Sequence, residues 1–268
     1  MRAAAREARA RARLLLAIAG LIAGGIVHGP AASQAPPGIA IVRPSVLAIG
    51  TFQATRVPQF RFLGTGFAVA DGTLAATSAH VLPASLDPGA DPELIVALLP
   101  GNEPTRAAAR RLTQLVVDRE HDIAVLRMDG SPLPPLKLRD SATVVEGESL
   151  MLTGFPIGGA LGLFPVTHRA MVAAIAPVAI PSMTGQQLDP KVIRRLRDAA
   201  FSVFQLDATA YPGNSGSPVY DPVTGEVVGI LNMAFVKGTK EAALTQPSGI
   251  SYAIPSSFLI EVLQRVPR

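Results

Sequence analysis

The sequence contains no cysteine, and this absence removes several kinds of chemistry at once. Without thiols the protein has no disulfide framework, no thiolate nucleophile and no cysteine-ligated metal centre. Its fold must therefore be held together by packing. The chain has 268 residues, 49% of them hydrophobic, which is enough to bury a large core in one domain of two lobes.

Aromatic residues are also scarce, at 5% of the chain, and tryptophan is missing. The formal net charge of +4 comes from 24 Lys and Arg against 20 Asp and Glu. Residues 1–13 hold five arginines and one glutamate, so 19 charges of each sign remain when this segment is set aside. A nearly neutral protein with few aromatic residues gives no electrostatic reason to expect nucleic-acid binding.

The first 35 residues are typical of a secretory signal peptide. Their arginine-rich start leads into an apolar run from Leu14 to Val27, followed by small residues suited to cleavage. This run would form a helix of about 21 Å, which is short of the ~30 Å bilayer core. We therefore expect a signal peptide over residues 1–35, an extended linker over 36–43 and a periplasmic or secreted protein. The alternative is an uncleaved membrane anchor with the folded part outside the cytoplasm.

Histidine is rare enough to restrict the candidate catalytic groups. The four histidines are His28, His80, His121 and His168, and none of them follows Ser215. A serine hydroxyl near neutral pH needs an imidazole to accept its proton and a carboxylate to orient that imidazole. The absence of a later histidine excludes the serine, acid, histidine order of the α/β-hydrolases.

One set of residues supplies the three groups in a different order, namely His80, Asp122 and Ser215. The subtilisin order would need an acid before the histidine, and the aspartate available there, Asp71, stands in a turn sequence. Taken singly, each member has a plainer explanation, as a buried core histidine, a capping carboxylate and a tight glycine turn. Their joint occurrence, in contexts that match a known family, favours a catalytic triad.

Short β-branched or alternating runs, separated by Gly, Pro, Asp and Asn, predict an all-β sandwich or barrel. The first predicted strands cover residues 46–49, 66–69, 94–99, 112–117 and 123–128. After a proline-rich connection over 132–141, the second set covers 150–152, 171–179, 203–206, 227–233 and 252–254, with a further strand at 219–220. Helices are expected over residues 190–200 and 256–266, the second one capped by Ser256 or Ser257.

Four local motifs resemble the trypsin-like serine proteases: residues 64–67, 77–81, 121–126 and 213–218. Further matches at 136–141, 154–158, 205–208 and 249–256 are similar to the HtrA/Deg branch. The resemblance implies two six-stranded antiparallel β-barrels with a C-terminal helix. It places the protease domain at 44–268, with the first barrel at about 44–131, the second at about 141–255 and the helix at 256–266.

The resemblance also implies roles for residues. Ser215 would be the nucleophile, His80 the general base and then acid, and Asp122 the orienting carboxylate, while the amides of Gly213 and Ser215 would form an oxyanion hole. No metal or cofactor is implied. The specificity pocket would be walled by Thr209, Ala210, Tyr211, Ile230, Leu231, Asn232, Met233, Ile250, Ser251 and Tyr252. Because no acid stands at Thr209, we expect cleavage after small or medium apolar residues.

Three departures from the family pattern suggest a second hypothesis. Ser217 replaces the usual second glycine, where a positive φ would strain a serine. His168 and Arg169 stand where small residues are usual, and residues 181–200 form an enlarged loop. These features motivate the alternative of a catalytically silent trypsin-like domain that binds proteins.

The resemblance implies polypeptide substrates, no nucleic acid, no membrane contact after signal cleavage, and a homotrimer. Because residue 214 is asparagine, the ion pair with a newly cleaved amino terminus that activates digestive relatives is not expected. Because only a short stretch follows Pro255 in the sequence, we do not expect a PDZ domain.

Overall fold

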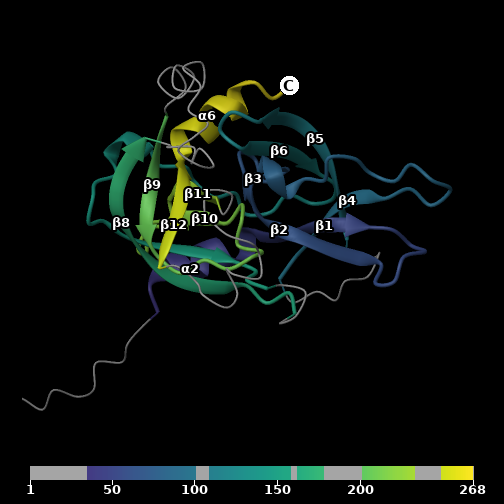
Figure 1. Cartoon of the computed structure of the whole chain (residues 1–268), viewed down its shortest axis with the longest axis horizontal. Helices are drawn as coiled ribbons and strands as arrows, with labels where there is room; N and C mark the ends of the chain where they lie inside the picture. The colour runs from purple at the N-terminus through teal and green to yellow at the C-terminus, as the bar shows by residue number, and fades with distance from the viewer. Residues whose placement is uncertain (1–34, 101–108, 158–161, 178–200, 233–248, 268) are drawn as a thin grey trace, which may run out of the picture. The chain divides into compact units, whose positions relative to one another are not determined.

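Two closed antiparallel barrels of six strands each form the architecture (Figure 1). The first has the order β1-β2-β3-β6-β5-β4 and the second β10-β11-β12-β9-β8-β7. The first-barrel strands are β1 (Val46–Phe52), β2 (Phe60–Val69), β3 (Leu74–Ser78), β4 (Leu94–Leu98), β5 (Arg110–Asp118) and β6 (Ile123–Met128). Those of the second are β7 (Ser149–Gly154), β8 (Val166–Pro177), β9 (Ser202–Asp207), β10 (Pro218–Tyr220), β11 (Val227–Asn232) and β12 (Ile250–Pro255). The predicted fold class is confirmed.

The computed structural model describes residues 35–100, 109–157, 162–177, 201–232 and 249–267. The predicted signal peptide and the predicted helix at 190–200 lie outside these residues, apart from Ala35. Within these ranges no helix is long and apolar enough to span a bilayer.

Several strands are apolar on both faces because each face meets a different core. All seven residues of β1 are buried. Leu47 and Ile49 fill the first barrel, while Val46 and Ala48 belong to a second cluster that also contains Ile230 from the other barrel. Burial on both faces explains why β1 has a continuous apolar run instead of alternation. It also means that the shared cluster holds the two barrels together.

The C-terminal helix α6 (Ser256–Gln264) packs its apolar stripe against this shared cluster, as predicted. Leu259 and Val262 are fully buried there. The predicted cap by Ser256 or Ser257 is wrong, because Pro255 occupies the N-cap position. The Ser257 amide, in the first turn, donates to the hydroxyl oxygen of Ser141 at 3.1 Å. The Ser256 hydroxyl instead donates to the carbonyl oxygen of Arg139 at 2.5 Å, so this serine fastens the helix to the connection between the barrels.

Residues 36–43 differ from the extended linker that the two prolines suggested. They form helix α2 (Pro37–Val42), with proline at its first position, which favours helix initiation. The Gly38 amide donates to the carbonyl oxygen of Pro222 at 2.9 Å, and a Cβ at Gly38 would lie 2.7 Å from that oxygen. Only glycine permits this approach, which ties the helix to a loop of the second barrel.

Asp118, at the end of β5, links the first barrel to the C-terminal helix. Its carboxylate accepts hydrogen bonds from the amides of Glu120 and His121, from the His121 ring and from Arg265, which follows α6. Burial opposes ionisation of Asp118, but the hydrogen bonds from His121 and Arg265 outweigh burial and lower its pKa from 3.8 to about 2. The carboxylate is therefore more stable as an anion in the folded protein than in the unfolded chain.

This lowered pKa makes stability depend on pH. A depressed folded-state pKa stabilises the protein above the unfolded value of 3.8 and loses that effect as pH falls towards 2. We expect Asp118→Asn to lower the free energy of unfolding by about 2 kcal/mol at pH 7. The difference from wild type should shrink as the pH falls from 4.5 to 2.5 in urea titrations. The control is Asp129→Asn, at an exposed carboxylate; an Asp118→Asn effect independent of pH would contradict the assignment.

Candidate active site

The three residues predicted as a triad lie together in the structure, although 135 positions separate the first from the last. The His80 Nε2 atom lies 2.9 Å from Ser215 Oγ, and the His80 Nδ1 atom lies 2.5 Å from Asp122 Oδ2. The imidazole thus bridges the hydroxyl and the carboxylate. Its side chain is 35% exposed, whereas Ser215 is 7% exposed, so a substrate can approach from the solvent side of the histidine.

Asp122 fixes the backbone of the histidine as well as its ring. His80 lies in a 3-10 helix, Ala79–Val81, directly after β3. The His80 amide donates to Asp122 Oδ1 at 2.8 Å, and the Ala79 amide donates to the Asp122 carbonyl oxygen at 2.9 Å. Asp122 has a φ of +54°, which costs a non-glycine residue of the order of 1–3 kcal/mol. Its surroundings must hold it in that conformation.

Asn232, at the end of β11, donates from Nδ2 to Asp122 Oδ2 at 2.7 Å. The sequence predicted this residue as part of a specificity pocket, and no signal in the sequence connected it with the carboxylate. The bond crosses from the second barrel to the first, because Asp122 directly precedes β6. Asn232 therefore supports the oxygen atom that also contacts His80.

Thr65, on β2, holds the loop that carries Ser215. The Thr65 amide donates to the Ser215 carbonyl oxygen at 2.9 Å, and its hydroxyl donates to the Gly213 carbonyl oxygen at 2.7 Å. The same hydroxyl accepts from the Phe155 amide at 3.1 Å. The sequence comparison identified the Gly64 to Phe67 motif but gave Thr65 no role. A polar residue between two glycines in an apolar strand was the available signal.

Two glycines of the serine loop adopt conformations that favour glycine. Gly213 has a φ of +102° and Gly216 a φ of +85°. A Cβ at Gly216 would lie 2.1 Å from the Thr65 carbonyl oxygen. Ser217 is not among the non-glycine residues with positive φ in the described chain, so the predicted backbone strain at this position is wrong. The predicted strain was the main argument against an active conformation of the serine loop, and the structure removes it.

The backbone amides of Gly213 and Ser215 are the predicted oxyanion hole. Within the described residues, neither amide donates a hydrogen bond to another protein group. Neighbouring amides of the loop are engaged, since Asn214 donates to the Tyr211 carbonyl oxygen and Gly216 to that of Leu231. Both candidate donors therefore remain available to a ligand oxygen.

The predicted specificity pocket is brought together only in part. Ile230 and Leu231 are fully buried in two different cores, so any contribution from them comes from backbone atoms. Ser251 is buried and donates to the Ala208 carbonyl oxygen at 2.7 Å, whereas Ile250 is 46% exposed. Of the other predicted wall residues, Ala210 is buried, Thr209, Tyr211 and Tyr252 are half-buried, and Met233 lies outside the described residues.

His168, one of the departures from the family pattern, lies on β8 beside a predicted pocket residue. Its ring centroid is 6.1 Å from that of Tyr211, with the planes at 43°. Burial lowers the pKa of His168, and its Nε2 atom has no hydrogen-bond partner in the described structure. Burial therefore favours the neutral form of the imidazole that borders the predicted pocket.

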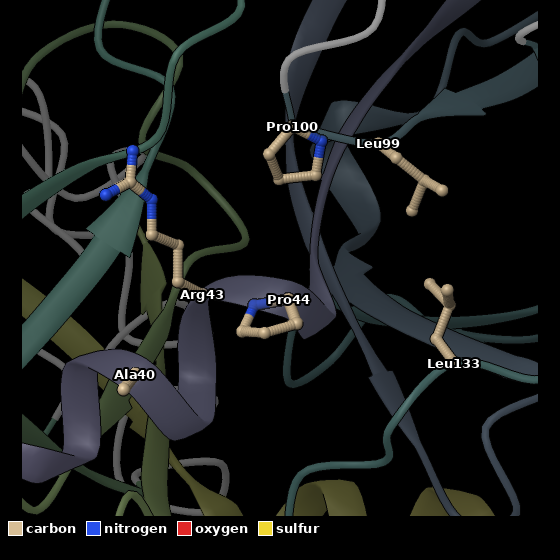
Figure 2. Close-up of a pocket in the computed structure, with 6 residues that line it drawn as sticks. All are labelled: Ala40, Arg43, Pro44, Leu99, Pro100 and Leu133. Atoms are coloured by element: carbon tan, nitrogen blue, oxygen red, sulfur yellow. The ribbon is translucent and has the colours of Figure 1, made fainter.

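A separate open pocket of about 390 Å³ contains none of the triad residues (Figure 2). Its lining is mostly apolar and comes from helix α2 and the turn after it, the end of β4, and the connection between the barrels: Ala40, Arg43, Pro44, Leu99, Pro100 and Leu133.

The Ser217 hydroxyl is fully buried and has no hydrogen-bond partner in the described part of the chain. A buried, unpaired hydroxyl is destabilising, so Ser217→Ala should raise the free energy of unfolding by about 1 kcal/mol. The matched control, Thr65→Val, removes a buried hydroxyl that has partners and should lower it by about 1–3 kcal/mol. Chemical denaturation measures both. A Ser217→Ala protein less stable than wild type would contradict this account of the loop.

Comparison with known proteins places these features in a family. The sequence model of a protein family described as the trypsin-like peptidase domain matches residues 64–230 of this chain. A probable periplasmic DegP-like serine endoprotease of Halomonas elongata is 28% identical over 208 residues, 77% of this chain and 35% of that protein. The mitochondrial serine protease HTRA2 of Bos taurus is 30% identical over 227 residues, 84% of this chain and 40% of that protein.

Solved structures agree on the fold. The Rv3671c protease from M. tuberculosis in its active form aligns with a TM-score of 0.59 and 20% identity, covering 86% of this chain and 84% of that one. The chain spans 35% and 40% of the length of the two sequence relatives, so it corresponds to the protease domain of those proteins. The barrels, the site geometry and the family match lead to one conclusion: the chain belongs to the trypsin-like peptidase domain family, with HtrA/DegP-like serine proteases among its homologues.

Proposed function

We propose that this protein is a serine endopeptidase that hydrolyses peptide bonds through an acyl-enzyme intermediate. The observation that carries the proposal is the continuous contact from Ser215 through the His80 ring to Asp122, at 2.9 and 2.5 Å. A hydroxyl, an imidazole and a carboxylate in this order form a complete proton-transfer unit. The homology to DegP-like and HtrA serine proteases supports the same chemistry.

In the first half of the reaction, Ser215 Oγ attacks the carbonyl carbon of the scissile peptide bond and gives its proton to His80 Nε2. Asp122 holds the ring and stabilises the imidazolium that forms. The negative charge that develops on the carbonyl oxygen is stabilised by the amides of Gly213 and Ser215. The tetrahedral intermediate then collapses, the C–N bond breaks, and the leaving amine takes the proton from His80.

In the second half, a water molecule attacks the acyl carbon and gives a proton to the same His80 nitrogen. Collapse of this intermediate breaks the bond to Ser215 Oγ and returns the proton to the serine. The products are a carboxylic acid and the free enzyme. The chain's own residues carry every proton in this cycle.

The main argument for a catalytically silent binding domain was backbone strain at Ser217, and this argument does not hold because Ser217 has no positive φ. Export from the cytoplasm is proposed from the predicted signal peptide and from relatives named as periplasmic. By analogy with such relatives, we propose a role in protein quality control or processing outside the cytoplasm. The homotrimer stays a prediction.

Covalent labelling tests the nucleophile. A fluorophosphonate probe should label the wild-type protein on Ser215 and should not label Ser215→Ala. Removing the serine should also lower turnover by roughly 10⁴ to 10⁶. The matched control is Ser217→Ala, which changes a serine two residues away and should still label. A folded wild-type protein that never reacts would refute the proposal and favour the silent domain.

Substrate preference follows from the residues near the predicted pocket. No acidic residue stands at Thr209, and the neighbouring Ala210 and Tyr211 carry no charge at neutral pH. We expect a peptide library to be cut mainly after small or medium apolar residues, with Ser215→Ala as the inactive control. Mass spectrometry of the products identifies the cut sites. A dominant preference for Lys or Arg would show that the pocket is built differently.

A further inference from the structure

His121, the neighbour of Asp122, lies between two phenylalanine rings. It stacks on Phe258 with a centroid distance of 4.1 Å and an interplanar angle of 17°. It meets Phe201 edge-on at 4.8 Å and 62°, and the two phenylalanines contact each other at 5.2 Å. We call these three residues the aromatic clasp. Such pairs contribute about 0.5–1.5 kcal/mol each beyond their burial.

The clasp joins three separate parts of the chain. His121 belongs to the loop between β5 and β6 of the first barrel, Phe201 directly precedes β9 of the second barrel, and Phe258 is on α6. In Figure 1, α6 runs alongside β6, the strand that begins after this loop. The clasp therefore connects the loop of the catalytic carboxylate to the second barrel and to the C-terminal helix.

Hydrogen bonds fix the orientation of the histidine within the clasp. Its Nδ1 atom lies 3.2 Å from Asp118 Oδ2, and its amide donates to Asp118 Oδ1 at 3.0 Å. Arg265 donates to the same oxygen, Asp118 Oδ2, at 2.5 Å. The His121 side chain is only 17% exposed. A phenylalanine could stack in this place and would keep the amide bond, but its ring could not bond Asp118 Oδ2, so only the histidine side chain supplies both restraints.

The aromatic clasp restrains the backbone on the amino-terminal side of Asp122. The Asp122 carbonyl oxygen and carboxylate are held by Ala79, His80 and Asn232. These contacts fix the side chain and the peptide that follows. The positive φ of Asp122 describes rotation about its own N–Cα bond, relative to the peptide group whose carbonyl belongs to His121. The clasp immobilises this side of the residue.

We propose that His121 is a positioning residue for the reaction, acting through Asp122, and that the aromatic clasp makes alignment of the carboxylate dependent on the docked C-terminal helix. The inference rests on the proposed function, because it assigns a kinetic effect to the clasp. No bond between His121 and the His80 or Ser215 side chain occurs in the described structure. Its effect is therefore indirect, through the backbone geometry of Asp122.

Two measurements on the full chain test the proposal, using His121→Ala, His121→Phe and a control. The first is the rate of labelling by a fluorophosphonate. His121→Ala should react about 10- to 100-fold more slowly than wild type, because small misplacements of catalytic groups have effects of that size. His121→Phe, which keeps the stacking but loses the ring's bond to Asp118, should fall between the two.

The second measurement does not require activity. A short, charge-assisted hydrogen bond strongly deshields its proton, so the proton on His80 Nδ1 gives a downfield resonance in ¹⁵N-histidine-labelled protein. Its disappearance in His80→Ala assigns it. In His121→Ala the resonance should move upfield or be lost to exchange with solvent. If the wild type fails to label, the proposed function fails, while this resonance still reports whether the clasp aligns Asp122.

The control is Leu263→Ala, which removes packing from the same helix but leaves the three clasp rings in place. All variants are compared under conditions where circular dichroism shows them folded. Leu263→Ala should keep the wild-type resonance and labelling rate. An equal loss in this control would mean that His121 acts only through overall stability, and would overturn the proposal.

A folded His121→Ala protein with the wild-type resonance and rate would also overturn it. If His121→Ala does not fold, Phe258→Leu provides the same test, because leucine keeps apolar bulk at the site and removes the stacked ring. A folded Phe258→Leu protein with a weakened resonance supports the proposal. An unchanged resonance in that variant refutes it.

Discussion

The candidate site depends on the alignment of two barrels, because His80 and Asp122 belong to the first and Ser215 to the second. The shared hydrophobic cluster brings the barrels together. Apolar contact is not directional, however, and cannot by itself fix the distances between atoms of the candidate site to within a few tenths of an ångström. The hydrogen bonds of Thr65 to Ser215 and Gly213 supply that precision. Thr65 is fully buried, so the loss of either hydrogen bond would leave a polar group without a partner and would lower the free energy of unfolding. Thr65 thus converts barrel packing into a defined position for Ser215, the proposed nucleophile.

Asp122 is the second point at which the barrels are coupled. Its carboxylate receives hydrogen bonds from the first barrel through His80 and from the second through Asn232. With both oxygens engaged, the carboxylate has little rotational freedom, and the imidazole inherits its orientation. A left-handed backbone is tolerated at this aspartate because contacts on every side over-determine it. The strain is local, and the surrounding packing sustains it.

Local patterns in the sequence predicted more of the fold than of the contacts in the candidate site. The strand Ile123–Met128 was predicted with the bounds it has, because a short run of buried apolar residues is a strong local signal. Strand β3 was missed as a strand, since Leu74 is followed by small residues of weak strand preference. The proximity of His80, Asp122 and Ser215 could be predicted because the motifs that contain them are local. The roles of Thr65 and Asn232 could not, because their partners lie 148 and 110 positions away and only the packed barrels bring them together.

The serine loop holds its shape without a buried charge. Asn214 and Ser217 are fully buried, and their side-chain polar atoms lack hydrogen-bond partners within the described residues. A carboxylate at 214 would require a cationic partner, since a buried unpaired charge is far more costly than a neutral amide. The neutral residue removes that requirement. Neutral hydrogen bonds from Thr65 to Ser215, and between Gly216 and Leu231, then suffice to set the loop, and these form as the barrels pack. The position of Ser215, the proposed nucleophile, is in this way a property of the fold itself.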